Sequence, residues 1–62
     1  MQISEADRFA ANILPIIKAI QESGATTLAA ITQALNNRGI SSARGGRWHI
    51  SAVQNVLARA RV

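Results

Sequence analysis

The hydrophobic positions between residues 4 and 22 have the spacing of an amphipathic helix. Apolar side chains recur every three or four residues and fall within an arc of about 100° on a helical wheel, the width of a stripe that faces a core. Ser4, followed three residues later by Asp7, resembles a capping box, and Gly24 suits the conformation that ends many helices. The stripe consists of Phe9, Ile13, Ile16, Ile17 and Ile20. We therefore expect a first helix over residues 4–22.

Pro15 lies within this hydrophobic stripe. It has no N–H to donate to the carbonyl of Ala11, and its ring crowds that carbonyl. We therefore expect a kink, or two shorter helices that meet near Leu14. Leu14 itself points away from the stripe, which is typical of a surface leucine and also compatible with contact to a preceding domain.

A second helical pattern covers residues 27–38. Thr26 or Thr27 can cap its start, and Gly39 suits its C-terminal end, after which Ile40 can fold back onto the helix. Its stripe consists of Leu28, Ile31 and Leu35. We expect a helix that is shorter than the first one and is packed through this stripe.

A third helical pattern covers residues 49–61. It starts at either His49 or Ser51, and Ser51 with Gln54 forms a second candidate capping box. Its apolar side consists of Val53, Val56, Leu57 and Ala60. Its polar side consists of Ser51, Gln54, Asn55, Ala58 and Arg59. No strand-like alternation appears, so the pattern predicts one all-α domain over residues 1–62. We expect a small three-helix bundle, helix-turn-helix-like, with a Gly/Arg-rich loop before the third helix.

The composition excludes several classes of protein. No cysteine is present among the 62 residues, which excludes disulfides and thiolate metal sites. The single histidine and three scattered carboxylates argue against a metal, a cofactor or an active site, so we expect a domain that is not an enzyme. The longest apolar run, Ile13 to Ile17, is far too short to span a membrane. Residues 1–5 lack the features of a signal peptide, so we expect a cytoplasmic location.

The charge is divided unevenly along the chain. Residues 1–35 carry two basic and three acidic side chains, a net charge of −1, whereas residues 36–62 carry five arginines and no acid, a net charge of +5. The five are Arg38, Arg44, Arg47, Arg59 and Arg61. Because arginine suits bidentate contacts to phosphate or guanine, this asymmetry favours a polyanionic partner. The alternative is an ordinary solvated surface.

The third helix and the loop before it carry groups that can contact DNA. Gln54 and Asn55 can pair with adenine edges in the major groove, and the small Ala58 permits a close approach. In the loop, Arg44 and Arg47 flank two glycines, which suits a narrow minor groove or a phosphate clamp. The alternative for the helix is the polar solvent face that every amphipathic helix has.

Trp48 and His49 close the loop. We expect Trp48 to anchor the core by burying its ring between helices, with stacking on a base as the alternative. His49 can contact a phosphate or cap the third helix. A phosphate-cradling nucleotide loop is excluded, because the chain has no GxxxxGK[ST] sequence and no strand before the loop.

Three segments of the chain form a specific combination: LAAITQALNNRGI over Leu28–Ile40, ARGGRW over Ala43–Trp48 and VQNVL over Val53–Leu57. This combination resembles the DNA-binding region of serine site-specific recombinases, the resolvases, invertases and their larger relatives. Members of that family read approximately IAxxLNxRGIPTPRGGxW, followed by a short helix with TVxxIL. The resemblance covers roughly residues 24–60. Its most specific feature is the pairing of LNxRGI with RGGxW.

The resemblance implies a double-stranded DNA-binding domain that positions a separate, covalently attached catalytic domain at its recombination site. A chain of this length is too short to contain that catalytic domain, so we expect part of a longer protein that is held on the bacterial nucleoid. Two departures from the family pattern matter. Ser41 and Ser42 replace a frequent Pro-Thr, which predicts a more mobile loop. Gln54 and Asn55 replace frequent basic residues, which favours base contacts over phosphate contacts.

We therefore expect the third helix in the major groove, the loop on the backbone or minor groove, and Arg38, Arg59 and Arg61 on phosphates. The candidate DNA-binding residues are Arg38, Arg44, Arg47, His49, Ser51, Gln54, Asn55, Arg59 and Arg61. Two alternatives remain. One is a stand-alone transcriptional regulator on the same fold. The other is a protein-interaction module that docks through Leu14 and the alanine-rich second helix.

Overall fold

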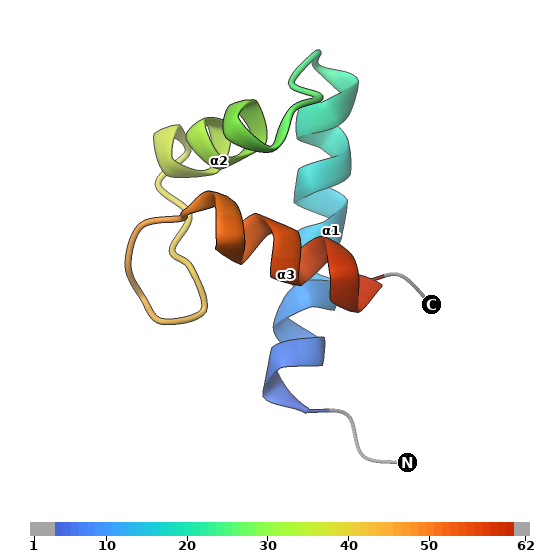
Figure 1. The fold of residues 1–62 in the computed structure, drawn as a ribbon, viewed down its shortest axis with the longest axis vertical. Coiled ribbons are helices and arrows are strands. Elements are labelled where there is room, and N and C mark those ends of the chain that lie inside the picture. Colours follow the sequence, from blue (N-terminus) through green and yellow to red (C-terminus); the bar gives the residue numbers. More distant parts are fainter. Residues whose placement is uncertain (1–3, 61–62) are drawn as a thin grey trace.

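Three helices make up the fold in the computed structural model, which describes residues 4–60 and, for Ala60, the backbone alone. They are α1 (Glu5–Glu22), α2 (Leu28–Asn37) and α3 (Ile50–Ala60), and residues 4–60 contain no strand. In Figure 1, α2 lies to the left of the upper part of the long α1, α3 crosses in front of α1, and the α2–α3 loop projects to the left below α2. The expected all-α three-helix bundle, with its Gly/Arg-rich loop before the third helix, is confirmed. Within residues 4–60, no helix has both the length and the apolar character needed to cross a bilayer.

Helix α1 begins and ends at the residues that the sequence indicates. The Ser4 hydroxyl accepts a hydrogen bond from the Asp7 backbone N–H at 3.1 Å. At the other end, Gly24 has a φ of +115°, and the Ala25 N–H donates to the carbonyl of Ile20 at 3.3 Å. This is a Schellman ending, in which a residue in the left-handed region turns the chain away from the helix. Both predicted ends of the helix are confirmed.

The helix continues through Pro15, so the expectation of two shorter helices is wrong. Ala11 and Pro15 are both exposed, which allows water to bind the carbonyl that lost its N–H partner. On the opposite side, Ile13, Ile17 and Ile20 are buried in the core. Their packing holds α1 together across the proline.

Helix α2 is capped by Thr27, whose hydroxyl accepts from the Ala30 N–H at 3.1 Å. It ends in a second Schellman motif, with Gly39 at a φ of +72° and the Ile40 N–H donating to Leu35 O at 3.2 Å. The Ile40 side chain packs against the core, as the sequence predicts. The chain therefore leaves α2 by folding back over its end.

The core is formed by side chains from all three helices and by Trp48 from the loop. Its buried members are Ala10, Ile13, Ile17, Ile20, Ile31, Leu35, Trp48, Val53 and Val56. The Trp48 side chain is only 2% exposed, and its ring stacks on Phe9 with centroids 5.7 Å apart. The prediction that Trp48 anchors the core is confirmed.

Helix α3 begins at Ile50, where the His49 carbonyl accepts from the N–H groups of Ala52 and Val53 at 3.0 and 3.2 Å. Ser51 therefore lies inside the helix, and the expected Ser51–Gln54 capping box is wrong. The physical reason is that the side chain of Asn36 bonds both backbone groups of Trp48, and this fixed backbone starts the helix directly after His49.

Candidate nucleic-acid interface

The α2–α3 loop contains a tight turn that presents Arg44. The Gly45 N–H donates to the Ser42 carbonyl at 2.8 Å, and the Ser42 N–H donates to the Gly46 carbonyl at 2.9 Å. Gly45 has a φ of +81°, a conformation that side chains with a Cβ rarely adopt. Arg44 occupies the third position of this turn and is exposed.

The end of this loop is joined to the end of α2 by Asn36. Its side-chain oxygen accepts from the Trp48 N–H at 2.8 Å, and its amide nitrogen donates to the Trp48 carbonyl at 3.1 Å. One side chain thus pairs with both backbone groups of a residue 12 positions away. These bonds fix the point where the loop becomes α3.

The sequence analysis assigned no role to Asn36 and missed these bonds. One signal for them is present in the sequence. Residue 36 is in register with Leu28 and Thr32, so it falls at the edge of the α2 surface that packs inward. An amide at such a half-buried position needs polar partners, because an unpaired polar group costs free energy there.

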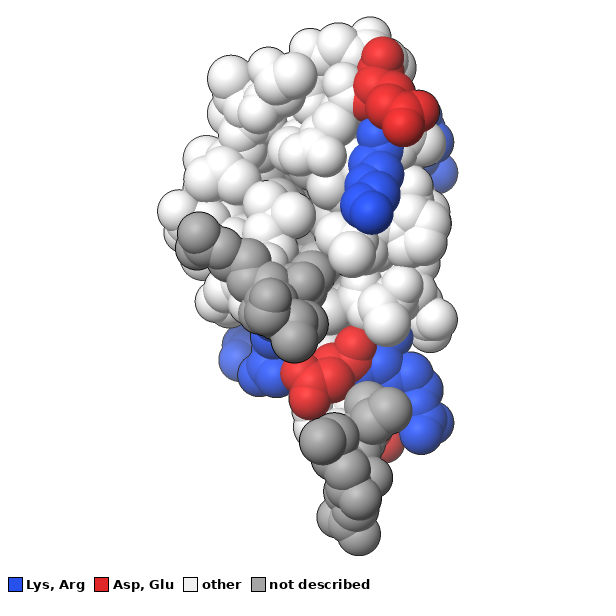
Figure 2. All heavy atoms as spheres, turned by 90° about the vertical axis from the view of Figure 1, so that its right-hand side faces the viewer, with Lys and Arg blue, Asp and Glu red and all other residues white. Residues whose placement is uncertain are grey.

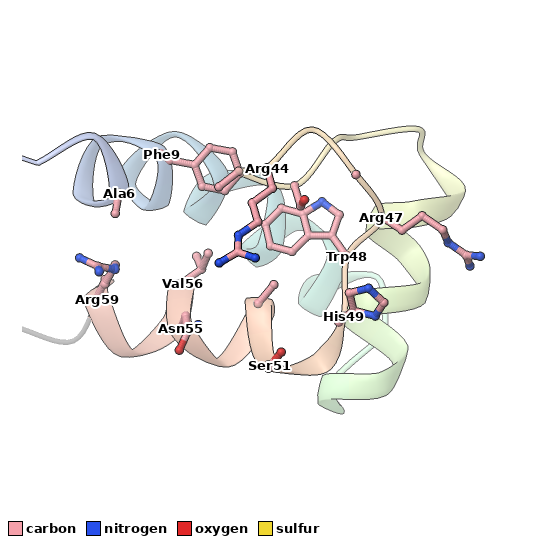
Figure 3. A pocket seen from close by; sticks show the side chains of 14 residues that line it. Ala6, Phe9, Arg44, Arg47, Trp48, His49, Ser51, Asn55, Val56 and Arg59 are labelled. Carbon is pink, nitrogen blue, oxygen red and sulfur yellow. The ribbon is translucent and has the colours of Figure 1, made fainter.

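A groove of about 590 Å³ lies between the loop, α3 and the N-terminal half of α1. Six of the nine candidate DNA-binding residues line it: Arg44, Arg47, His49, Ser51, Asn55 and Arg59. Phe9, Trp48 and Val56 give it an apolar wall. In Figure 3, Arg44 extends from the loop into the groove, whereas Arg47 points away from it. The fold therefore brings polar and cationic groups from two separate segments of the sequence to one concave surface.

Arg59 lies at the α1 end of this groove and is paired with Asp7. Its Nη1 donates to Asp7 Oδ1 at 2.9 Å, and both side chains remain about half exposed, at 47% and 49%. The hydrogen bonds that Asp7 receives from Arg59 and Ser4 lower the pKa of its carboxyl below the usual 3.8. The bond to Asp7 uses one nitrogen of the guanidinium, Nη1, so the other N–H donors of the half-exposed Arg59 side chain remain available to a phosphate.

A scan against protein-family models matches the Recombinase family over residues 10–62, which include most of α1 and the whole of the loop and α3. The chain belongs to the Recombinase family. The resemblance of the sequence to recombinases is thereby confirmed, and the membership indicates a recombination-related function. Searches of the curated proteins and of the solved structures gave no significant match.

The other candidate residues of this Recombinase domain lie outside the groove. Gln54 lies in a second, shallower groove of about 410 Å³ with Leu28, Leu57 and Ala58. One residue step turns a helix by about 100°, so Gln54 and the neighbouring Asn55 face different grooves. Arg38 is exposed at the C-terminal cap of α2, and Arg61 lies outside the described residues.

The acidic side chains of the Recombinase domain are concentrated on its first helix. Within residues 4–60 they are Glu5, Asp7 and Glu22, all in α1. Figure 2 shows the face on the right of Figure 1, where acidic and basic side chains lie next to each other. The α2–α3 loop projects on the other side, and no acid follows Glu22 in the sequence. Among residues 4–60, no ion pair involves the loop arginines Arg44 and Arg47.

Proposed function

We propose that this chain is the sequence-specific, double-stranded DNA-binding domain of a serine site-specific recombinase. In this proposal it positions a separate catalytic domain at the recombination site, and the domain itself takes no part in the chemistry of strand exchange. Family membership supports the recombination context. The DNA-binding role rests on the arrangement of the loop and α3.

The observation that carries the proposal is the groove shared by these two segments. Arg44 enters it from the loop, while Ser51 and Asn55 line it from α3. A guanidinium suits phosphate or guanine, and an amide can pair with the edge of adenine. Such a surface fits a duplex, which presents both backbone phosphates and base edges.

The outward side of α3 supports placing this helix in the major groove. Its residues Ser51, Gln54, Asn55, Ala58 and Arg59 are all exposed, as the sequence predicts. Val53 and Val56 on the inward side are buried, so α3 is held on the bundle by one side while it offers the other. The two hydrogen bonds between Asn36 and the backbone of Trp48 fix the loop relative to this helix, so that both can contact one duplex together.

Competition binding separates the residues that read bases from those that hold phosphates. The preferred duplex is selected from a random pool, and binding to it is compared with binding to a scrambled duplex. Replacing Gln54 or Asn55 with alanine should weaken the preferred complex by about 1–3 kcal/mol and the scrambled one much less. Arg47→Ala should weaken both complexes to a similar degree. Lys18→Ala, an exposed cation on α1, is the charge-matched control and should change neither.

Two results would contradict the proposal. Equal affinity for preferred and scrambled duplexes would remove sequence-specific binding. Full site preference in the Gln54 and Asn55 variants, with loss of preference in the Arg44 and Arg47 variants, would make the loop the recognition element and α3 only its support.

A further inference from the structure

Ile50 is a large apolar side chain that the fold leaves in solvent. Its exposed fraction is 46%, and within residues 4–60 it is the one large hydrophobic residue that is exposed. It belongs neither to the core nor to the apolar side chains packed against it. Its position is the first residue of α3, the end at which a recognition helix contacts base edges. Core packing therefore does not account for Ile50.

The helix places Ile50 in line with Gln54. Residues four and seven positions apart share one side of a helix, so Ile50, Gln54 and Leu57 form a strip. Gln54 and Leu57 line the shallow groove next to α2, together with Leu28 and Ala58. The strip is distinct from the Ser51–Asn55–Arg59 strip that lines the larger groove. It combines apolar side chains with a single amide and carries no charge.

This chemistry matches one feature of the DNA major groove. Thymine presents a C5-methyl group there, which apolar side chains contact, and adenine presents the donor and acceptor that a glutamine amide can pair with. Guanine and phosphate instead attract arginine, which the other strip and the loop provide. An uncharged isoleucine–glutamine pair on one helix side is therefore suited to A·T pairs.

We propose that Ile50 is a specificity-determining residue that contacts a thymine methyl group, next to an adenine paired with Gln54. The inference rests on the proposed DNA binding by α3. It adds a residue that the charge pattern does not reveal, and it divides the reading of bases between two strips of one helix.

A thymine-to-uracil scan tests this contact by removing only the methyl group. Each thymine of the selected duplex is replaced in turn by deoxyuridine, and dissociation constants are measured for the wild-type chain and for Ile50→Ala. At one or two thymines, uracil should weaken wild-type binding roughly fourfold, the effect of one buried methyl group. At the same positions, Ile50→Ala should bind the thymine and uracil duplexes within about twofold of each other.

Gln33→Ala is the control, because it alters an exposed residue of α2 that lines neither groove, and it should keep the sensitivity to uracil. Circular dichroism checks that both variants keep their helices, which an exposed position favours. A selected site that tolerates uracil at every thymine overturns the inference, as does equal discrimination by wild type and Ile50→Ala. Sequence-specific binding that persists in either case leaves the proposed function standing. Failure to select any preferred duplex removes both.

Discussion

Replacing Asn36 with alanine tests whether its side chain holds the loop to the bundle. The substitution removes two hydrogen bonds, at 2.8 and 3.1 Å, and leaves the Trp48 N–H and carbonyl without these partners. At about 1 kcal/mol for each bond, the loss amounts to about 2 kcal/mol of unfolding free energy. A domain of this size has about 3–9 kcal/mol in total, so the effect is large.

Thermal unfolding measures this loss directly. A change of about 2 kcal/mol should lower the Tm by about 8–16 °C in a domain of this size. Asn37→Ala is the matched control, since it removes the same residue type from the same helix end at an exposed position. Its effect should stay within about 0.5 kcal/mol. Trp48 is the only tryptophan of the chain, so its fluorescence reports on the loop junction while circular dichroism follows the helices.

Two melting curves for Asn36→Ala and Asn37→Ala that coincide within about 2 °C would refute the reasoning. They would mean that the Asn36 bonds contribute no net stability, and that packing of Trp48 against Phe9 alone fixes the junction.

Two further predictions concern stability. Trp48→Ala empties a buried position and should lower the unfolding free energy by roughly 3–5 kcal/mol. Circular dichroism should therefore show a largely unfolded chain. A cooperative, folded variant that only loses DNA affinity would instead favour stacking of Trp48 on a base. The Asp7–Arg59 ion pair stabilises the fold while the Asp7 carboxylate is charged. Because the pKa of Asp7 in the folded state lies below the usual 3.8, this contribution is lost as the pH falls from 3.8 through that lower pKa. The Tm of the wild type should therefore fall more steeply below about pH 4 than that of Arg59→Gln, and parallel curves would contradict this coupling.

The helices were predictable because their signals are local. Spacing of apolar residues, hydroxyl caps at Ser4 and Thr27, and glycines after α1 and α2 each depend on a few neighbouring residues. At Pro15 a kink or two shorter helices were expected, and the second alternative was wrong. The cost of a proline inside a helix depends on whether water can reach the carbonyl of Ala11. That exposure is a tertiary property, set by how α1 packs.

The candidate site was predictable by residue type but not by arrangement. Arg44 and Asn55 were identified from charge and helix face, yet their shared groove depends on the path of the loop. Asn36, which fixes that path, acts across 12 residues of sequence and leaves little local signal. The pairing of Asp7 with Arg59 spans 52 residues, and no periodicity within one helix could indicate it. Contacts between distant segments therefore account for what the sequence did not reveal.

The salt dependence of duplex binding tests the central claim most directly. With four or five arginines on phosphates, the logarithm of the affinity should fall with the logarithm of the salt concentration at a slope of about −4. Removing Arg47 should flatten this slope by about one unit. Fluorescence anisotropy with a labelled duplex across a range of sodium chloride concentrations measures both slopes. A slope near zero, or binding absent at low salt, would contradict the account that the loop and α3 of this Recombinase domain bind DNA.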